Sequence, residues 1–274
     1  MDTRSKKAVL FIIFNRPEIA AKTFAKICAY RPERLYIAAD GARKECVGEE
    51  NLCQKTRANV INAINWPCEV KTLFHDKNLG CGRGPYTAIS WFFEHEEEGI
   101  ILEDDCCPCP EFFPFCEEML ELYRDNEHIA QINTFNAKSP KLGNSYFFTG
   151  YPRCWGWATW ARAWQHMDFE MKTWKQERRN IFRRFNPWEG LIHYWHWNQN
   201  YRIIKNGGKP SIWDYQWGIY IFLQNKLCIT PEVNLIENIG FSEGTHCSGG
   251  DKKLERLCYG QLQLLRFLVK IILY

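Results

Sequence analysis

Short apolar runs alternate with amphipathic stretches over the first 130 residues of the chain. The runs at 9–14, 35–40, 68–76 and 99–105 have the length and content of buried strands. Helices are expected after the first three runs, ending near residues 30, 64 and 97. Because strands that alternate with helices are typical of a parallel sheet covered on both faces, we predict an α/β fold with a mostly parallel sheet flanked by helices.

The second half of the chain has a less regular pattern. It contains a tryptophan-rich block at 154–164, a basic aromatic stretch at 174–201 and the apolar segment 211–224. No Ser/Gly-rich linker, low-complexity tract or internal repeat separates the two halves of the sequence. We therefore expect a single domain over residues 1–274.

The charge balance says little about a partner, whereas the aromatic content is high. The chain carries 35 Lys and Arg residues against 32 Asp and Glu residues, a formal net charge of +3, so nucleic acid is not an expected partner. Aromatic residues make up 15% of the chain and include 12 Trp. Flat rings that also hydrogen-bond suit sugar faces and wet interfaces.

The apolar segments near the two ends are short. The first run is interrupted by Asn15 and Arg16, and it is too short for a signal peptide or a transmembrane helix. A cytoplasmic location is therefore expected, with the 13 cysteines as thiols. The segment 262–274 has two interpretations: a helix docked on the core, or an amphipathic anchor in peripheral contact with the inner face of the membrane.

Polar side chains follow each of the predicted strands. Asn15 and Arg16 come after the first, Asp40 ends the second, Arg83 lies in a glycine-rich segment after the third, and the acidic triplet 103–105 ends the fourth. In open α/β sheets ligands bind at the carboxyl ends of the strands. We therefore expect these side chains to converge on one crevice.

The acidic triplet is the strongest chemical signal in the sequence. Glu103, Asp104 and Asp105 directly follow a buried strand, and three adjacent carboxylates repel one another unless a cation or hydrogen-bond donors meet them. Mn²⁺ or Mg²⁺ would bind such oxygens and complete its shell with diphosphate oxygens. The alternative is a solvated acidic turn.

The other strand-end residues each have two interpretations. Arg16 and Arg83 suit phosphate oxygens, with a surface ion pair as the alternative. Asp40 can reach a ribose hydroxyl or a base N–H, or it can bond locally to the backbone. The segment 78–84, NLGCGRG, is expected to be a loop, but it matches neither glycine-rich phosphate motif.

Asp214, His246 and a group of cysteines could also carry chemistry. Asp214, in the aromatic segment WDYQW, is a candidate general base whose apolar setting would raise its pKa, and a capping or ion-paired Asp is the alternative. His246 could contact a metal or a diphosphate. The cysteines that follow the acidic triplet could indicate a zinc site, but their spacing favours small apolar thiols at a turn. They are Cys106, Cys107, Cys109 and Cys116.

Together these segments resemble the GT-A glycosyltransferases, in particular the inverting N-acetylglucosaminyltransferase I group and uncharacterised bacterial nucleotide-diphospho-sugar transferases. VLFIIFNRPE is similar to the family's first strand and Arg-bearing turn, AADGA to the strand end whose Asp holds the uracil, and ILEDD to the segment with ribose and metal contacts. The resemblance implies that Arg16 approaches the diphosphate and Asp40 the uracil. It places Glu103 and Asp104 beside the nucleotide-sugar and makes Asp105 the direct metal ligand.

The resemblance continues through the second half of the chain. CWGWATWARAW is similar to a Gly-Trp stretch beside the donor sugar and acceptor, and FSEGTH to a late loop ending in a His, which is His246 here. WDYQW is similar to the segment that supplies the catalytic base, but Tyr215 stands where the family has a second aspartate. Asp214 is accordingly the predicted base, and the predicted acceptor-side residues are Trp155, Trp157 and Trp160.

The resemblance implies a metal-dependent, inverting glycosyltransferase. Residues 1–130 would bind a UDP-sugar donor, and Asn15 and Arg83 are also predicted to contact that nucleotide-sugar. Residues 131–274 would bind the hydroxyl of a glycan or lipid-linked glycan acceptor. Two alternatives remain at this point: a sugar nucleotidyltransferase, and a catalytically inactive carbohydrate-binding relative.

Overall fold

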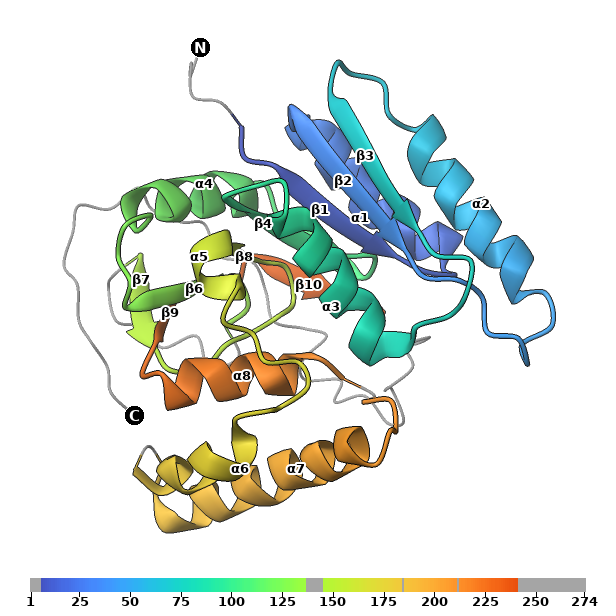
Figure 1. Ribbon diagram of the computed structural model, residues 1–274. Coiled ribbons are helices and arrows are strands. Elements are labelled where there is room, and N and C mark those ends of the chain that lie inside the picture. Colours follow the sequence, from blue (N-terminus) through green and yellow to red (C-terminus); the bar gives the residue numbers. More distant parts are fainter. Residues whose placement is uncertain (1–5, 137–144, 184, 211, 241–274) are drawn as a thin grey trace.

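The computed structural model describes residues 6–136, 145–183, 185–210 and 212–240, and its centre is a mixed sheet (Figure 1). Within these residues, eight strands pair in the order β3-β2-β1-β4-β8-β6-β9-β7, and β5 pairs with β10. Four of the seven pairings in the large sheet are parallel. The strands are β1 (Val9–Ile13), β2 (Arg34–Ala39), β3 (Glu69–Phe74), β4 (Glu98–Glu103), β5 (Cys106–Pro108), β6 (Ile129–Asn133), β7 (Tyr146–Thr149), β8 (Trp157–Trp160), β9 (Leu227–Pro231) and β10 (Ile236–Asn238).

Helices cover both faces of the sheet, which confirms the predicted fold class. Helices α1, α2 and α4 pack against one face, and α3, α5 and α8 against the other. The helices are α1 (Pro17–Tyr30), α2 (Glu49–Asn62), α3 (Gly80–Phe93), α4 (Phe112–Leu122), α5 (Ala161–Trp164), α6 (Trp174–Glu177), the 3₁₀ helix η1 (Arg178–Arg183), α7 (Pro187–Lys205) and α8 (Asp214–Leu223).

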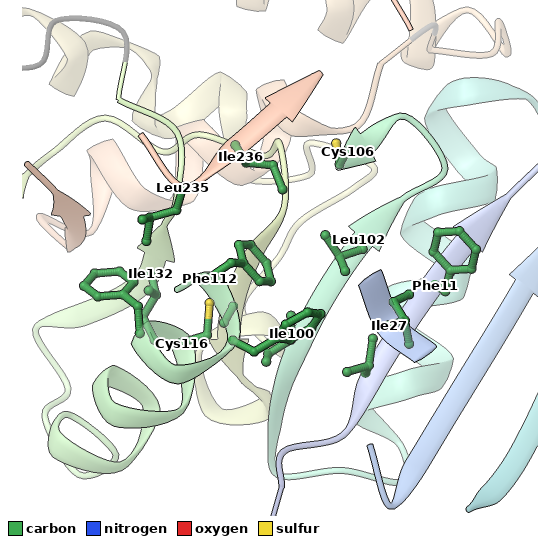
Figure 2. Packing of buried hydrophobic residues seen from close by; sticks show 14 of the residues in the cluster. Phe11, Ile27, Ile100, Leu102, Cys106, Phe112, Cys116, Ile132, Leu235 and Ile236 are labelled. Atoms are coloured by element: carbon green, nitrogen blue, oxygen red, sulfur yellow. The ribbon is translucent and has the colours of Figure 1, made fainter. Parts of the chain in front are cut away.

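Strand β1 is apolar throughout because both of its faces are buried. Phe11 packs in the cluster that includes α1 and α4, whereas Leu10 packs in the cluster that includes α3 and α8. Figure 2 shows the first cluster, in which Phe112 of α4 lies near Leu102 of β4 and Ile236 of β10. A continuous apolar run is the pattern that a doubly covered strand requires.

The segment 78–84 is not the loop that its glycines predict, because α3 already begins at Gly80. The carboxylate of Asp40 accepts hydrogen bonds from the backbone N–H groups of Leu79 (2.8 Å) and Gly80 (2.9 Å). A carboxylate at this position satisfies N–H groups that the helix itself leaves unpaired. The glycines therefore form the first turn of a helix.

The second half builds a third layer below the sheet. Figure 1 shows α8 between the sheet and α7. Trp174, Trp197 and Phe222 belong to the apolar cluster that joins α6, α7 and α8. Helix α7 begins cleanly because Asn186 accepts a hydrogen bond from the N–H of Glu189 (3.0 Å) and Pro187 occupies the first turn. In the part of the chain that the structure describes, no helix combines the length and apolar character needed to cross a membrane.

Candidate functional site

The candidate site lies where the order of the strands reverses. From β1 the chain adds β2 and β3 on one side, and it then returns to place β4 on the other side of β1. Ile12 of β1 pairs with Glu103 of β4, so these two strands end side by side. Such a switch point opens a crevice at the carboxyl ends of the strands, which is where open α/β sheets bind ligands.

Arg16 and the acidic turn meet at this switch point, as the sequence predicts. The guanidinium donates to the Asp104 carboxylate through Nη2 and through Nε (3.3 Å), and Nη2 also donates to Asp105 Oδ2 (3.1 Å). The Arg16 side chain is 19% exposed, and those of Asp104 and Asp105 are 5% and 15% exposed. Burial alone would lower the pKa of Arg16, but the two carboxylates raise it above its ordinary value. The guanidinium is therefore held as a cation.

Glu103 and Asp214 are two further carboxyl groups beside Arg16, Asp104 and Asp105. Burial, together with the neighbouring Asp105, Asp104 and Asp214, raises the pKa of Glu103 to about 8. Burial together with Asp214 and Glu103 also raises the pKa of the Cys154 thiol. The fold thus brings Asp214 near the acidic triplet, and Glu103 holds its proton near neutral pH.

Asp214 does not have the apolar setting that its sequence neighbours predict. It is exposed and forms the first residue of α8, whereas Trp213 and Trp217 are buried in the core. The expectation was wrong because the helical turn directs these tryptophans inward and leaves the carboxylate outside. A carboxylate in the first turn of a helix is stabilised by the N-terminal end of the helix dipole.

Gly240 closes one side of the ion pair, and the sequence gives no sign of this. The Ile239 N–H donates to the backbone carbonyl of Asp105 (2.8 Å), which extends the pairing of β10 with β5. A Cβ atom on Gly240 would lie 2.7 Å from Asp105 Cβ and 2.8 Å from Arg16 Nη1. Only a glycine fits here, and the need for it arises from a pairing between strands far apart in the sequence.

Asn15 and Asp40 are bound by neighbouring protein groups. The Asn15 amide donates to Glu49 Oε1 (2.8 Å), and buried Glu49 also accepts from Arg43. Asp40 accepts from the N–H of Gly41, which is the local backbone bonding of its alternative interpretation, and also from Asn78, Leu79 and Gly80, which lie far from it in the sequence. Their predicted contacts with the nucleotide stay predictions.

Arg83 lies in the surface ion pair that was its alternative. Its Nη2 donates to Glu170 Oε1 (2.6 Å), and its guanidinium lies over the Phe169 ring at 4.9 Å. Both partners of the ion pair are more than two-fifths exposed. The structure therefore does not bring Arg83 together with Arg16 and the acidic turn.

Two of the three acceptor-side tryptophans are core residues. Trp157 is 0% and Trp160 1% exposed, on opposite faces of β8. A fully buried ring cannot stack on a sugar, so the acceptor-side prediction is wrong for these two residues. The alternation of side chains along a strand, with both faces covered, explains their burial. Trp155 is half-buried against Phe135, and its acceptor role stays a prediction.

The acidic turn does not fit a divalent cation as its side chains stand. Arg16 binds the carboxylates of both Asp104 and Asp105, so a metal ion would have to displace it. Within the described ranges, no group of three or more His, Cys, Asp or Glu side chains is arranged to hold a metal. The second predicted ligand, His246, lies outside those ranges.

Cavities of about 310 and 270 Å³ lie elsewhere, and no predicted site residue lines them. In the larger one, Asp168 bonds to Thr173, and Gln216 bonds to Asn200 and to the Phe169 carbonyl. These polar groups already have protein partners. We therefore place the candidate site at the switch point, where the charged groups gather.

The chain has distant likenesses to solved structures. No known family model matches the sequence, and no curated protein matches it significantly. UDP-glucose pyrophosphorylase complexed with UDP-glucose is 11% identical, with 91% of this chain and 96% of that chain covered and a TM-score of 0.42. Mouse xyloside xylosyltransferase 1 is 9% identical over 80% and 81%, with a TM-score of 0.38. The galactosyltransferase LgtC in complex with donor and acceptor sugar analogs is 12% identical over 82% and 86%, with a TM-score of 0.35.

Proposed function

We propose that this chain is a glycosyltransferase that binds a nucleotide-diphosphate sugar, with UDP as the nucleotide, at the switch point between β1 and β4. The observation that carries the proposal is the half-buried Arg16 guanidinium, held against the acidic turn at the carboxyl ends of both strands. Its bonds to the turn use Nε and Nη2. Within the described part of the chain, the N–H groups of Nη1 can therefore donate to a diphosphate oxygen. Arg binds phosphate oxygens well because its planar guanidinium carries several donors in a fixed arrangement.

Arg16 would neutralise the leaving group in place of a metal ion. As the bond between the anomeric carbon and the diphosphate breaks, negative charge develops on the leaving nucleoside diphosphate. A fixed cation stabilises that charge without any reorganisation during the reaction. Asp104 and Asp105 would hold the guanidinium in position for this role.

Asp214 would act on the acceptor side. An acceptor hydroxyl forms the new bond to the anomeric carbon, and its proton passes to the Asp214 carboxylate while the nucleoside diphosphate departs from the opposite face. The result is inversion at the anomeric carbon. The position of Asp214 near the acidic triplet and at the exposed start of α8 supports this assignment.

Replacing Asp214 with asparagine should reduce sugar transfer by about a hundredfold or more, because the amide cannot accept the proton. The measurement is UDP release from a panel of UDP-sugars, in water and with glycan acceptors. Asp125→Asn changes another exposed aspartate and should leave the rate unchanged.

UDP binding and UTP formation, measured alongside UDP release, separate the rival functions. UDP affinity should be equal in wild-type protein and Asp214→Asn, since the base does not bind the nucleotide. Equal rates in the two proteins would remove Asp214 from the mechanism. Formation of UTP from a UDP-sugar and pyrophosphate would instead indicate a sugar nucleotidyltransferase, and UDP binding without turnover of any sugar would indicate an inactive relative.

A further inference from the structure

Helix α7 exposes a stripe of large apolar side chains. Trp188 is 79% exposed, Leu191 53%, Ile192 58% and Trp195 56%. Their spacing of three and four residues places them on one face of the helix. Of the eleven exposed large hydrophobic residues in the described ranges, six lie between positions 182 and 203. The apolar surface is therefore concentrated here.

This stripe belongs to a well-anchored helix. The opposite face of α7 is buried through Gly190, Trp197 and Asn200, and Trp197 packs on Trp174 with ring centroids 5.9 Å apart. The exposed face thus has a fixed direction, away from the core. Because a contiguous exposed apolar patch rimmed by polar residues marks an interaction site in a folded protein, the stripe needs a partner.

The surroundings of the stripe are strongly basic. Residues 172–209 contain nine Lys and Arg residues against two Glu residues, although the whole chain has a net charge of only +3. Helix η1, which packs beside α7, exposes Arg179 and Arg183. Arg202, seven residues after Trp195, continues the stripe along the same face of α7 and is exposed. The partner should therefore combine an apolar phase with negative charge.

We propose that α7 docks in the plane of an anionic lipid surface. The four apolar side chains would insert among the lipid headgroups, and the surrounding basic residues would contact the charged headgroups. A helix with an apolar face and a Lys/Arg-rich surround binds membranes in this way, and Trp favours the interface. Charge argues against two other partners for the stripe, a second copy of the chain and the chain's own apolar segment 262–274. A second copy would bring like charges together, and the chain's own apolar segment 262–274 carries Arg266 and Lys270 as its only charges.

The test compares full-length proteins in co-sedimentation with vesicles. The vesicles contain phosphatidylcholine alone, or equal parts of phosphatidylcholine and phosphatidylglycerol. Wild-type protein should bind the anionic vesicles, and salt should weaken this binding. The variant Trp188→Ser with Trp195→Ser should bind roughly tenfold less tightly or worse. The matched control, Leu52→Ser with Leu122→Ser, changes two exposed apolar residues outside α7 and should bind normally.

Three results would overturn the proposal. The first is wild-type protein that does not bind anionic vesicles. The second is binding that survives the α7 changes but is lost with Phe267→Ser and Val269→Ser, which would place the contact in the segment 262–274. The third is a dimer in light scattering that the α7 changes convert to a monomer, which would identify a second copy as the occupant. The melting temperatures of the variants and the wild-type protein should be equal, which excludes unfolding as the cause of lost vesicle binding.

Discussion

Replacing Arg16 with methionine is expected to destabilise the protein by about 3–5 kcal/mol at neutral pH, because it leaves buried carboxylates without their cation. Asp104 and Asp105 are 5% and 15% exposed, so water would replace only part of what the guanidinium supplies. Urea denaturation at neutral pH measures this loss. Changing Asp104 and Asp105 to asparagine in the same protein should restore most of it, because the uncompensated charge is removed.

Arg83→Met is the matched control for this change. Arg83 also pairs with a carboxylate, but the side chains of Arg83 and Glu170 are 45% and 43% exposed. Water screens such a pair, so the expected loss is below about 1 kcal/mol. Equal losses in the two variants would mean that the Arg16 cluster has no special role in the fold.

Replacing Gly156 with alanine is expected to cost about 3 kcal/mol, the sum of a strained backbone and an overpacked core. Gly156 has a φ of +52°, and its Cβ would lie 2.6 Å from Ile236, 3.1 Å from Leu102 and 3.1 Å from Phe112. All three side chains belong to the packed cluster shown in Figure 2. Thermal and urea unfolding measure the change.

Gly150→Ala provides the comparison for this prediction. Its Cβ would meet only Phe222, at an ordinary 4.0 Å, and the backbone of Gly150 is not left-handed. A change within about 1 kcal/mol is expected there. If Gly156→Ala were equally mild, the packing between β4, α4 and β10 would differ from the one described.

The parallel half of the fold and the meeting of Arg16 with the acidic triplet could be predicted from the sequence. Strands buried on both faces produce uninterrupted apolar runs such as 9–14, and the polar residues that follow mark where each run ends. Once β1 and β4 are recognised as parallel neighbours, Arg16 and Asp104 must lie close together. The local sequence pattern and the sheet topology therefore both predict the position of Arg16 beside the acidic triplet.

The remaining features depend on pairings that local pattern does not encode. Gly240 matters because β10 pairs with β5, and Trp157 is buried because α5 and α8 cover its face of the sheet. The glycines after residue 78 predict a loop, but the Asp40 carboxylate caps a helix there. The exposed stripe on α7 was missed because the Trp-rich sequence around it also supplies the buried face.

The most direct test of the proposed site is calorimetric titration of UDP into the protein in the presence of EDTA, repeated with Mn²⁺ and with the variant Arg16→Lys. Lysine keeps the positive charge but lacks the fork of donors that reaches both the acidic turn and a phosphate. The proposal predicts that wild-type protein binds UDP in EDTA and that Arg16→Lys binds it roughly tenfold less tightly or worse. Binding that requires Mn²⁺, or equal affinity in the variant, would contradict the role of Arg16 as the cation of the site, and the absence of UDP binding would contradict the nucleotide site itself.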